Sequence, residues 1–297
     1  MNGIIVIDKQ KDFTSFDVVA IMRGILREKK VGHSGTLDPM ATGVLPILVG
    51  TAAKAQSLLP DTAKEYIAEF RLGITTDTLD ITGRVLSENK CSHTKEEINS
   101  ILPRFIGDIM QVPPMYSAVQ KNGVRLYDLA RQGIEVEREA RPVTINRLEL
   151  ISFDEEKQNG KLIISCSKGT YIRVICDDIG KALGCGCVMT ELRRTRACGF
   201  TVESAVTLDE LKEIKEQGRL EEYIMPVDSI FSDFALVRVS EKQAVRFCNG
   251  APLDLDRLSG MKNRNDGELI RVYSGGGFLG LGTVKTETNQ LRMKKRF

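Results

Sequence analysis

The feature that most constrains this 297-residue chain is a glycine-rich stretch built around one aspartate, Asp38. The stretch covers residues 32–46 and reads GHSGTLDPMATGVLP. Because Pro39 disfavours the α region for the residue before it, we expect Asp38 on extended or turn backbone rather than inside a helix. The stretch also holds glycines that would let the backbone approach a ligand closely, namely Gly32, Gly35 and Gly43. It therefore predicts a loop that presents a carboxylate.

Several chemistries could use such a loop. A nucleotide phosphate site is not supported, because the Gly-Lys-Ser/Thr ending of a P-loop is absent. A metal site lacks ligands, because the chain has only two histidines, His33 and His93, and the loop has no second acidic residue. The residues alone leave two interpretations open for Asp38. One is a catalytic carboxylate, and the other is the usual solvated or capping Asp of an Asp-Pro turn.

The loop and several later segments match the motifs of one enzyme family. The loop string closely resembles the catalytic-loop motif of the TruB-type tRNA pseudouridine synthases, Gly-His-Thr-Gly-Thr-Leu-Asp-Pro-Leu-Ala-Thr-Gly, from which it departs at Ser34 and Met40. Further family motifs follow in the family's order: QVPPMYSA at 111–118, RLY at 125–127, ARQG at 130–133 and KGTYIR at 168–173. At residues 8–15 the chain reads DKQKDFTS and lacks the Pro and Gly of the family's Asp-Lys-Pro-x-Gly-x-Thr-Ser. That departure leaves the backbone path of this loop open.

The resemblance implies an enzyme that isomerises uridine to pseudouridine at position 55, in the T-loop of tRNA. This reaction breaks the bond between uracil N1 and ribose C1′, turns the bound base, and joins C5 to C1′. It involves no redox change, so we expect no cofactor and no metal. It needs a base flipped out of its stack and an ionised carboxylate beside the glycosidic bond. The resemblance implies that Asp38 is this nucleophile and that Arg173 pairs with it, which keeps a buried carboxylate charged.

The resemblance also assigns roles to five further side chains. Tyr66 matches the family tyrosine that stacks on the target base, and its hydroxyl could relay a proton. Tyr171 and Leu192 match positions that line the uracil pocket. His33 would contact a T-loop base and help to hold the flipped conformation, and Lys9 would brace the catalytic loop. For Tyr66 and Leu192, ordinary core packing is the alternative interpretation.

Residues 1–232 alternate between strand-like and helix-like patterns without a strict βαβ order. Strand-like stretches lie at 3–7, at 64–73 and at 162–167, with 170–173 continuing the last one. Helix-like stretches lie at 15–27 with Ser15 as the cap, at about 95–105, and at 176–183 with Gly184 as the stop. This mixture predicts an α+β catalytic domain with a mixed, largely antiparallel sheet. It agrees with the pseudouridine synthase fold that the resemblance implies.

The last part of the chain differs in charge and in pattern. Residues 235–297 hold twelve Lys/Arg and six Asp/Glu, whereas the net charge of the whole chain is only +2. Excess positive charge in a small unit suits contact with an RNA backbone, and a solvated basic tail is the alternative. A strand at 235–239, a helix near 241–248, and a hairpin of 269–273 with 278–284 predict a compact β unit. We place the boundary near 232, and the resemblance implies that 233–297 is a PUA-like RNA-binding domain.

Residues 115–143, which follow Pro113 and Pro114, mix aromatic with basic side chains: Tyr116, Lys121, Arg125, Tyr127, Arg131, Arg138 and Arg141. In the family this segment is a mobile thumb that closes over the T-loop, and a solvated helix and loop is the alternative interpretation. A folded RNA loop is recognised by its shape and its splayed bases rather than by groove reading. The implied partner is therefore tRNA, bound through its T-loop and T-stem.

Composition limits where the chain could act. With 42% hydrophobic and 28% charged residues it suits one large or two moderate soluble domains. No apolar run reaches membrane-spanning length, no signal peptide is evident, and the seven cysteines are odd in number and scattered. We therefore expect a cytoplasmic monomer with no membrane partner. Nothing resembles the extensions of the guide-RNA-directed relatives, so no guide RNA is expected. A catalytically idle RNA-folding protein remains the alternative function.

Overall fold

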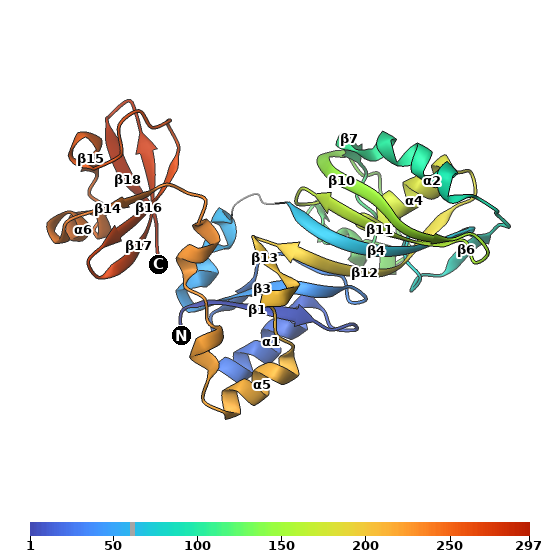
Figure 1. Cartoon of the computed structure of the whole chain (residues 1–297), viewed down its shortest axis with the longest axis horizontal. Coiled ribbons are helices and arrows are strands. Elements are labelled where there is room, and N and C mark those ends of the chain that lie inside the picture. The colour runs from blue at the N-terminus through green and yellow to red at the C-terminus, as the bar shows by residue number, and fades with distance from the viewer. Residues whose placement is uncertain (60–62) are drawn as a thin grey trace.

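The structure, a computed structural model, describes residues 1–59 and 63–297, which form a larger and a smaller unit (Figure 1). Within the described residues, the larger unit is built on a nine-stranded sheet. Along its main path the strands are β1 (Gly3–Lys9), β3 (Thr42–Val49), β12 (Cys187–Ala197), β4 (Lys64–Leu72), β11 (Asn159–Cys166), β10 (Arg141–Asp154) and β7 (Gly107–Gln111). Two short strands lie off this path, β2 (Val31–His33) beside β3 and β13 (Phe200–Thr201) beside β12.

The sheet is mixed but largely antiparallel, which confirms the predicted α+β class. Every pair on the path is antiparallel except β12 with β3, which run parallel where Arg193 faces Thr42 and Arg194 faces Gly43. This parallel contact brings β12 against the last part of the glycine-rich stretch. The topology therefore joins two segments that lie about 150 residues apart in the chain.

Helices cover the sheet in two groups (Figure 1). Near β1 lie α1 (Ser15–Leu26) and α5 (Leu208–Glu216), whereas α4 (Ile172–Ala182) packs on β12 with α2 (Lys95–Ile101) beside it. Short 3-10 turns connect other elements: η1 (Gly50–Leu58), η2 (Leu102–Phe105), η3 (Val202–Ser204), η4 (Leu220–Tyr223) and η5 (Val227–Phe231). The helix expected at 95–105 is thus α2 followed by the tighter turn η2. None of the described helices is long and apolar enough to cross a membrane.

The cap of α1 differs from the prediction. Thr14, not Ser15, is the N-cap, because its side chain accepts a hydrogen bond from the backbone N–H of Asp17 and the Asp17 carboxylate accepts one from the Thr14 N–H. Ser15 is buried and instead bonds to Leu37 in the glycine-rich loop. The helix itself follows the expected apolar stripe, which buries Val18, Val19, Met22, Ile25 and Leu26.

The predicted strand at 170–173 is wrong. After β11 the chain turns at Gly169, whose φ of +83° favours glycine, and the Thr170 hydroxyl donates to the carbonyl of Ser167. Helix α4 then begins at Ile172, four residues earlier than expected, and Arg173 lies in its first turn. The residues that α4 contributes to the main apolar core recur with helical spacing: Ile172, Ile175, Cys176 and Ile179. The stop at Gly184 is confirmed, since α4 ends at Ala182.

The smaller unit contains the predicted strand, helix and hairpin. Its five-stranded sheet runs β14 (Leu236–Arg238), β16 (Leu269–Ser274), β17 (Gly277–Lys285), β18 (Gln290–Arg296) and β15 (Leu253–Asp254), with α6 (Glu241–Cys248) and the turn η6 (Leu255–Arg257) packed on it. It has its own apolar core, which includes Phe247, Ile270 and Val284. Rings of Phe231, Phe278 and Phe297 pack together where it meets the larger unit.

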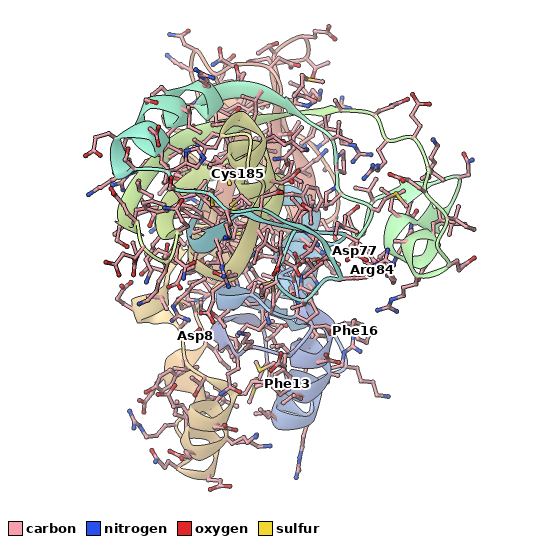
Figure 2. All side chains as sticks on the ribbon, turned by 90° about the vertical axis from the view of Figure 1, so that its right-hand side faces the viewer. Asp8, Phe13, Phe16, Asp77, Arg84 and Cys185 are labelled. Atoms are coloured by element: carbon pink, nitrogen blue, oxygen red, sulfur yellow. The ribbon has the colours of Figure 1, made fainter. Side chains whose placement is uncertain are left out.

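Two short hairpins lie beside the main sheet of the larger unit. The first pairs β5 (Ile74–Thr76) with β6 (Val85–Glu88). The second pairs β8 (Gln120–Lys121) with β9 (Val124–Arg125) and leads into α3 (Leu126–Arg131). This second hairpin and α3 belong to residues 115–143, which we call the thumb segment. In Figure 2 the thumb segment, in green, projects from the main body on the right.

Candidate active site

Asp38 lies in the loop between β2 and β3, outside any helix, as the following proline predicts. Two contacts fix this loop to the N-terminal segment. The Leu37 N–H donates to the Ser15 hydroxyl at 2.8 Å, and the Asp12 N–H donates to the Pro39 carbonyl at 2.9 Å. Asp12 stands where the family motif has glycine, and its φ is +68°. Aspartate is one of the few non-glycine residues that tolerate this left-handed conformation, so the chain turns here without the glycine.

Lys9 lies beneath the same loop. Its ammonium donates to the carbonyls of Phe13 at 2.6 Å, Gln10 at 2.9 Å and Pro39 at 3.2 Å. The side chain is fully buried, and this burial lowers the pKa of Lys9 to about 8, against the opposing attraction of Asp38. Lys9 therefore connects the N-terminal segment to the loop that carries Asp38, through hydrogen bonds to backbone carbonyls.

Arg194 holds the other side of the loop and was missed by the sequence analysis. It is fully buried on β12, and its guanidinium donates to the carbonyls of Val44 at 2.7 Å, Thr36 at 3.3 Å and Gly35 at 3.3 Å. The signal that could have found it is the two-residue period of a strand, which places Arg194 on the same face as Leu192.

Gly43 serves this packing rather than a ligand. A Cβ at Gly43 would lie 2.2 Å from the backbone oxygen of Arg194, and its φ is +103°. The prediction that this glycine allows close approach of a ligand is therefore wrong. What it allows is the parallel contact between β3 and β12.

Arg173 forms the charged centre of the site. Its Nη2 lies 3.2 Å from Oδ2 of Asp38, and its Nη1 lies 3.6 Å from Oδ2 of Asp80. The same Nη2 donates to the backbone carbonyl of Tyr116 at 2.6 Å. The Arg173 side chain is only 5% exposed, whereas that of Asp38 is 37% exposed. A buried guanidinium thus faces one accessible carboxylate and one buried carboxylate.

Asp80 is the second residue that the sequence analysis missed. It lies in the loop after β5 and is almost completely buried. One of its carboxylate oxygens, Oδ1, accepts from the backbone N–H of Thr82 at 3.0 Å and from the Thr78 hydroxyl at 2.9 Å, which leaves Oδ2 to face Arg173. The signal was the alternation of Thr and Asp over residues 75–82, a pattern rich in side chains that bond to backbone.

A pocket of about 250 Å³ opens at this centre. Five of the seven predicted site residues line it: Asp38, Tyr66, Tyr171, Arg173 and Leu192. They come from the loop between β2 and β3, from β4, from the start of α4 and from β12. Burial raises the pKa of Tyr66, so its phenol stays protonated at neutral pH. The pocket therefore combines a carboxylate with rings that can hold one planar base.

His33 and the thumb segment line an adjoining cleft of about 1110 Å³. The Nδ1 atom of His33 is buried with no hydrogen-bond partner among the described residues, and burial together with Arg194 lowers the pKa of His33. The thumb-segment residues that line the cleft include Tyr116, Arg125, Tyr127 and Arg131. The guanidinium groups of Arg125 and Arg131 lie 5.7 and 5.5 Å from the centre of the Tyr127 ring. The predicted interleaving of cations and aromatic rings thus faces the cleft.

The remaining predicted residues lie elsewhere. Lys9 lines neither cavity. In the thumb segment, Lys121 donates to the carbonyl of Glu137, and Arg138 donates to the carbonyl of Pro113. Arg141, the first residue of β10, is exposed and also lies outside both cavities. In the described part of the chain, no group of three or more His, Cys, Asp or Glu side chains is arranged to hold a metal ion.

Solved structures share this architecture. A chain of a Cbf5-Nop10-Gar1 complex matches with a TM-score of 0.76 at 26% identity, over 99% of this chain and 84% of that chain. A chain of the archaeal box H/ACA sRNP Nop10-Cbf5 complex matches with a TM-score of 0.73 at 24% identity, over 99% and 86%, and supports the fold alone. The sheet and the terminal β unit are therefore those of a known class, the pseudouridine synthase fold.

Sequence comparison narrows this class. Residues 23–172 match the TruB family pseudouridylate synthase N-terminal domain, and residues 173–232 match the tRNA pseudouridylate synthase B C-terminal domain. The tRNA pseudouridine synthase B of Clostridium perfringens is 46% identical over 95% of both chains, and that of Clostridium tetani is 43% identical over 97% of both. That of Pseudomonas fluorescens is 42% identical over 97% of this chain and 93% of its own. The chain belongs to the TruB family of pseudouridylate synthases.

Proposed function

We propose that this protein isomerises uridine to pseudouridine at position 55 in the T-loop of tRNA, with Asp38 as the nucleophile. The observation that carries the proposal is the ion pair between Asp38 and Arg173 inside a pocket lined by aromatic rings. The names of the curated relatives, tRNA pseudouridine synthase B, support tRNA as the substrate.

The reaction is balanced without a co-reactant. The bond between N1 and C1′ breaks, the base turns within the pocket, and a bond between C5 and C1′ forms. The proton on C5 leaves, and N1 gains a proton. The Asp38 carboxylate starts the reaction by one of three routes: addition to C6 of uracil, attack on C1′, or removal of the proton at C2′. The same carboxylate position serves all three.

The other residues hold the base and the loop in this proposal. Tyr66 stacks on the flipped uracil, and because its phenol remains protonated it can donate a proton but does not act as a base at neutral pH. Tyr171 and Leu192 close the sides of the pocket. His33 contacts a T-loop base in the adjoining cleft, and Lys9 keeps the catalytic loop in position.

We further propose a division of labour along the chain. Residues 1–232 form the catalytic domain, with residues 115–143 as the thumb that contacts the RNA. Residues 233–297 form a PUA-like domain that binds the tRNA away from the reacting base. The separate apolar cores of the two units support this division. The protein would act in the cytoplasm as a monomer, without a guide RNA.

The test is to incubate the purified protein with unmodified tRNA, without added metal or nucleotide, and to map pseudouridine by carbodiimide-dependent primer-extension stops. We expect one new stop at the T-loop uridine and none with the Asp38→Asn variant. A protein that binds tRNA tightly but leaves no stop would support an RNA-folding role instead. If product appears only after a guide RNA is added, the stand-alone proposal fails.

A further inference from the structure

Phe16 is an exposed aromatic residue for which the reaction provides no role. It lies in the first turn of α1, and its side chain is 65% exposed, although α1 buries an apolar stripe on its other face. A single exposed ring is common on protein surfaces. This one differs because it lines the 1110 Å³ cleft that also contains Asp38 and Arg173. Figure 2 shows Phe16 at the end of α1, on the side of the thumb segment.

The backbone that carries Phe16 is hydrogen-bonded to the Asp38 loop through the neighbouring residue. Its neighbour Ser15 is buried and exchanges hydrogen bonds with both backbone groups of Leu37, the residue before Asp38. Phe16 directly follows Ser15, and Asp38 directly follows Leu37, so the hydrogen bonds between Ser15 and Leu37 place the two residues near each other. A strand that places a uridine at Asp38 would bring a flanking nucleotide past Phe16.

The side chain of Arg23 lies over the Phe16 ring. The guanidinium of Arg23 is 5.8 Å from the centre of the Phe16 ring, and one of its nitrogens donates to the carbonyl of Val31 at 3.3 Å. An aromatic ring with an arginine beside it is the arrangement that proteins use to bind single-stranded nucleic acid, with a base on the ring and a phosphate near the cation. Tyr127, between Arg125 and Arg131, repeats the arrangement within the same cleft.

The positive charges of the cleft lie where a flanking strand would pass. Three carboxylates and three arginines line the cleft, and two of the carboxylates, Asp38 and Asp80, share Arg173 at the reaction centre. Away from that centre, the thumb arginines Arg125 and Arg131 line the cleft, and Arg23 adds a positive charge beside Phe16. The chemistry that fits Phe16 is therefore a nucleotide with an accessible base and a nearby phosphate.

We propose that Phe16 and Arg23 form a second nucleotide subsite, in which an unpaired nucleotide flanking the reacting uridine stacks on Phe16 and places its phosphate at Arg23. This subsite deepens the proposed function and rests on it. It holds the strand during base turning but touches no reacting atom, so it should act on binding rather than on the chemical step.

The test measures the dissociation constant and the pseudouridine-forming kinetics on a T-arm stem-loop RNA. We expect Phe16→Ala and Phe16→Leu to raise both KM and Kd roughly tenfold, the size of one lost base stack, with kcat unchanged. Phe16→Tyr keeps the ring and should match the parent. Met110→Ala is the matched control, since Met110 is also 65% exposed but lies on the edge strand β7, outside both cavities. Because Phe16 is exposed, its substitution leaves the core intact.

A second measurement identifies the nucleotide. RNAs that carry an abasic site at each position of the loop in turn are bound to the parent and to Phe16→Ala. We expect one abasic position that weakens the parent roughly tenfold and adds no further loss to Phe16→Ala. Equal losses in both proteins at every position would overturn the subsite, and so would an unchanged Kd for Phe16→Ala. A parent that binds but forms no pseudouridine would instead count against the proposed function, since the coupling in Kd is read independently of turnover.

Discussion

Arg173 lies 3.2 Å from Asp38 through the same nitrogen, Nη2, that donates to the backbone carbonyl of Tyr116 at 2.6 Å. Tyr116 is near the start of the thumb segment, so the Asp38 carboxylate and the thumb segment contact the same nitrogen of Arg173. The other end of that guanidinium faces Asp80. The Arg173 guanidinium therefore contacts both a buried carboxylate and the segment proposed to contact the RNA.

Replacing Asp38 should separate chemistry from binding. We expect Asp38→Asn to lower the rate of pseudouridine formation by roughly four orders of magnitude or more, as removal of a nucleophile does in other enzymes. The affinity for tRNA should stay near that of the parent, because the amide keeps the shape of the side chain. Single-turnover kinetics and filter binding measure the two quantities. Asp12→Asn, in the same cleft, is the control, and equal rates for both variants would contradict the assignment.

Replacing Arg173 should affect both stability and turnover. Arg173→Met leaves Asp80 buried without its cation, so we expect a loss of about 3–5 kcal/mol in the free energy of unfolding. Arg173→Lys keeps the charge but lacks the planar fork that spans two carboxylates, so it should retain more stability and still lose much of kcat. Denaturant unfolding and kcat are the measurements. If Arg173→Lys turns over like the parent, the geometry of the fork is unimportant.

Two adjacent arginines on β12 offer a matched comparison. Arg194 is fully buried against three backbone carbonyls, two in the Asp38 loop and one on β3, and Arg194→Met leaves those carbonyls without donors, for which we expect a loss of about 3 kcal/mol or more. Arg193 is 41% exposed and pairs with Asp8, so Arg193→Met should cost about 1 kcal/mol or less. Thermal unfolding compares the two variants. Similar losses would show that the buried arginine does not hold the catalytic loop.

Lys9 should give stability a specific pH dependence. Its pKa is about 8 in the folded protein and about 10.5 when unfolded, so between these values the unfolded state binds more protons. The contribution of Lys9 to the free energy of unfolding should therefore rise with pH from about 8 to 10.5, by an amount on the order of 3 kcal/mol. Unfolding of the parent and of Lys9→Met across this range isolates the effect. Parallel pH profiles for the two proteins would refute it.

The smaller unit should contribute to binding through charge. Arg292, Lys294 and Arg296 are all exposed on β18, where a bulge at Lys294 interrupts the pairing with β17. Changing all three to Gln should weaken tRNA binding and lower the slope of log K against log salt by about two, if they neutralise phosphates. The controls are Lys212→Gln and Lys215→Gln on α5, which should leave the slope unchanged. An unaltered slope for the triple variant would place the phosphate contacts elsewhere.

Where sequence reasoning was wrong, the error has a physical cause. Thr14 and Ser15 are both good N-caps, and the choice between them came from the bond that Ser15 makes to Leu37, which lies 22 residues away. The strand expected at 170–173 was a continuation of the one at 162–167, whereas the chain turns at Gly169 and then starts α4, which places Arg173 toward Asp38. A tertiary contact thus decided the cap of α1, and a local turn ended the strand before residue 170.

What the sequence by itself determined was local. The Asp-Pro loop, the apolar stripes of the helices, the terminal hairpin and the family motifs are all carried by neighbouring residues, and their periodicity or composition is visible without a fold. Only the tertiary structure decided that Arg194 holds the Asp38 loop, that Gly43 packs against β12, and that Asp80 shares Arg173 with Asp38. These contacts join residues far apart in the chain, and they exist only where the register of the sheet and the burial of charge bring the partners together.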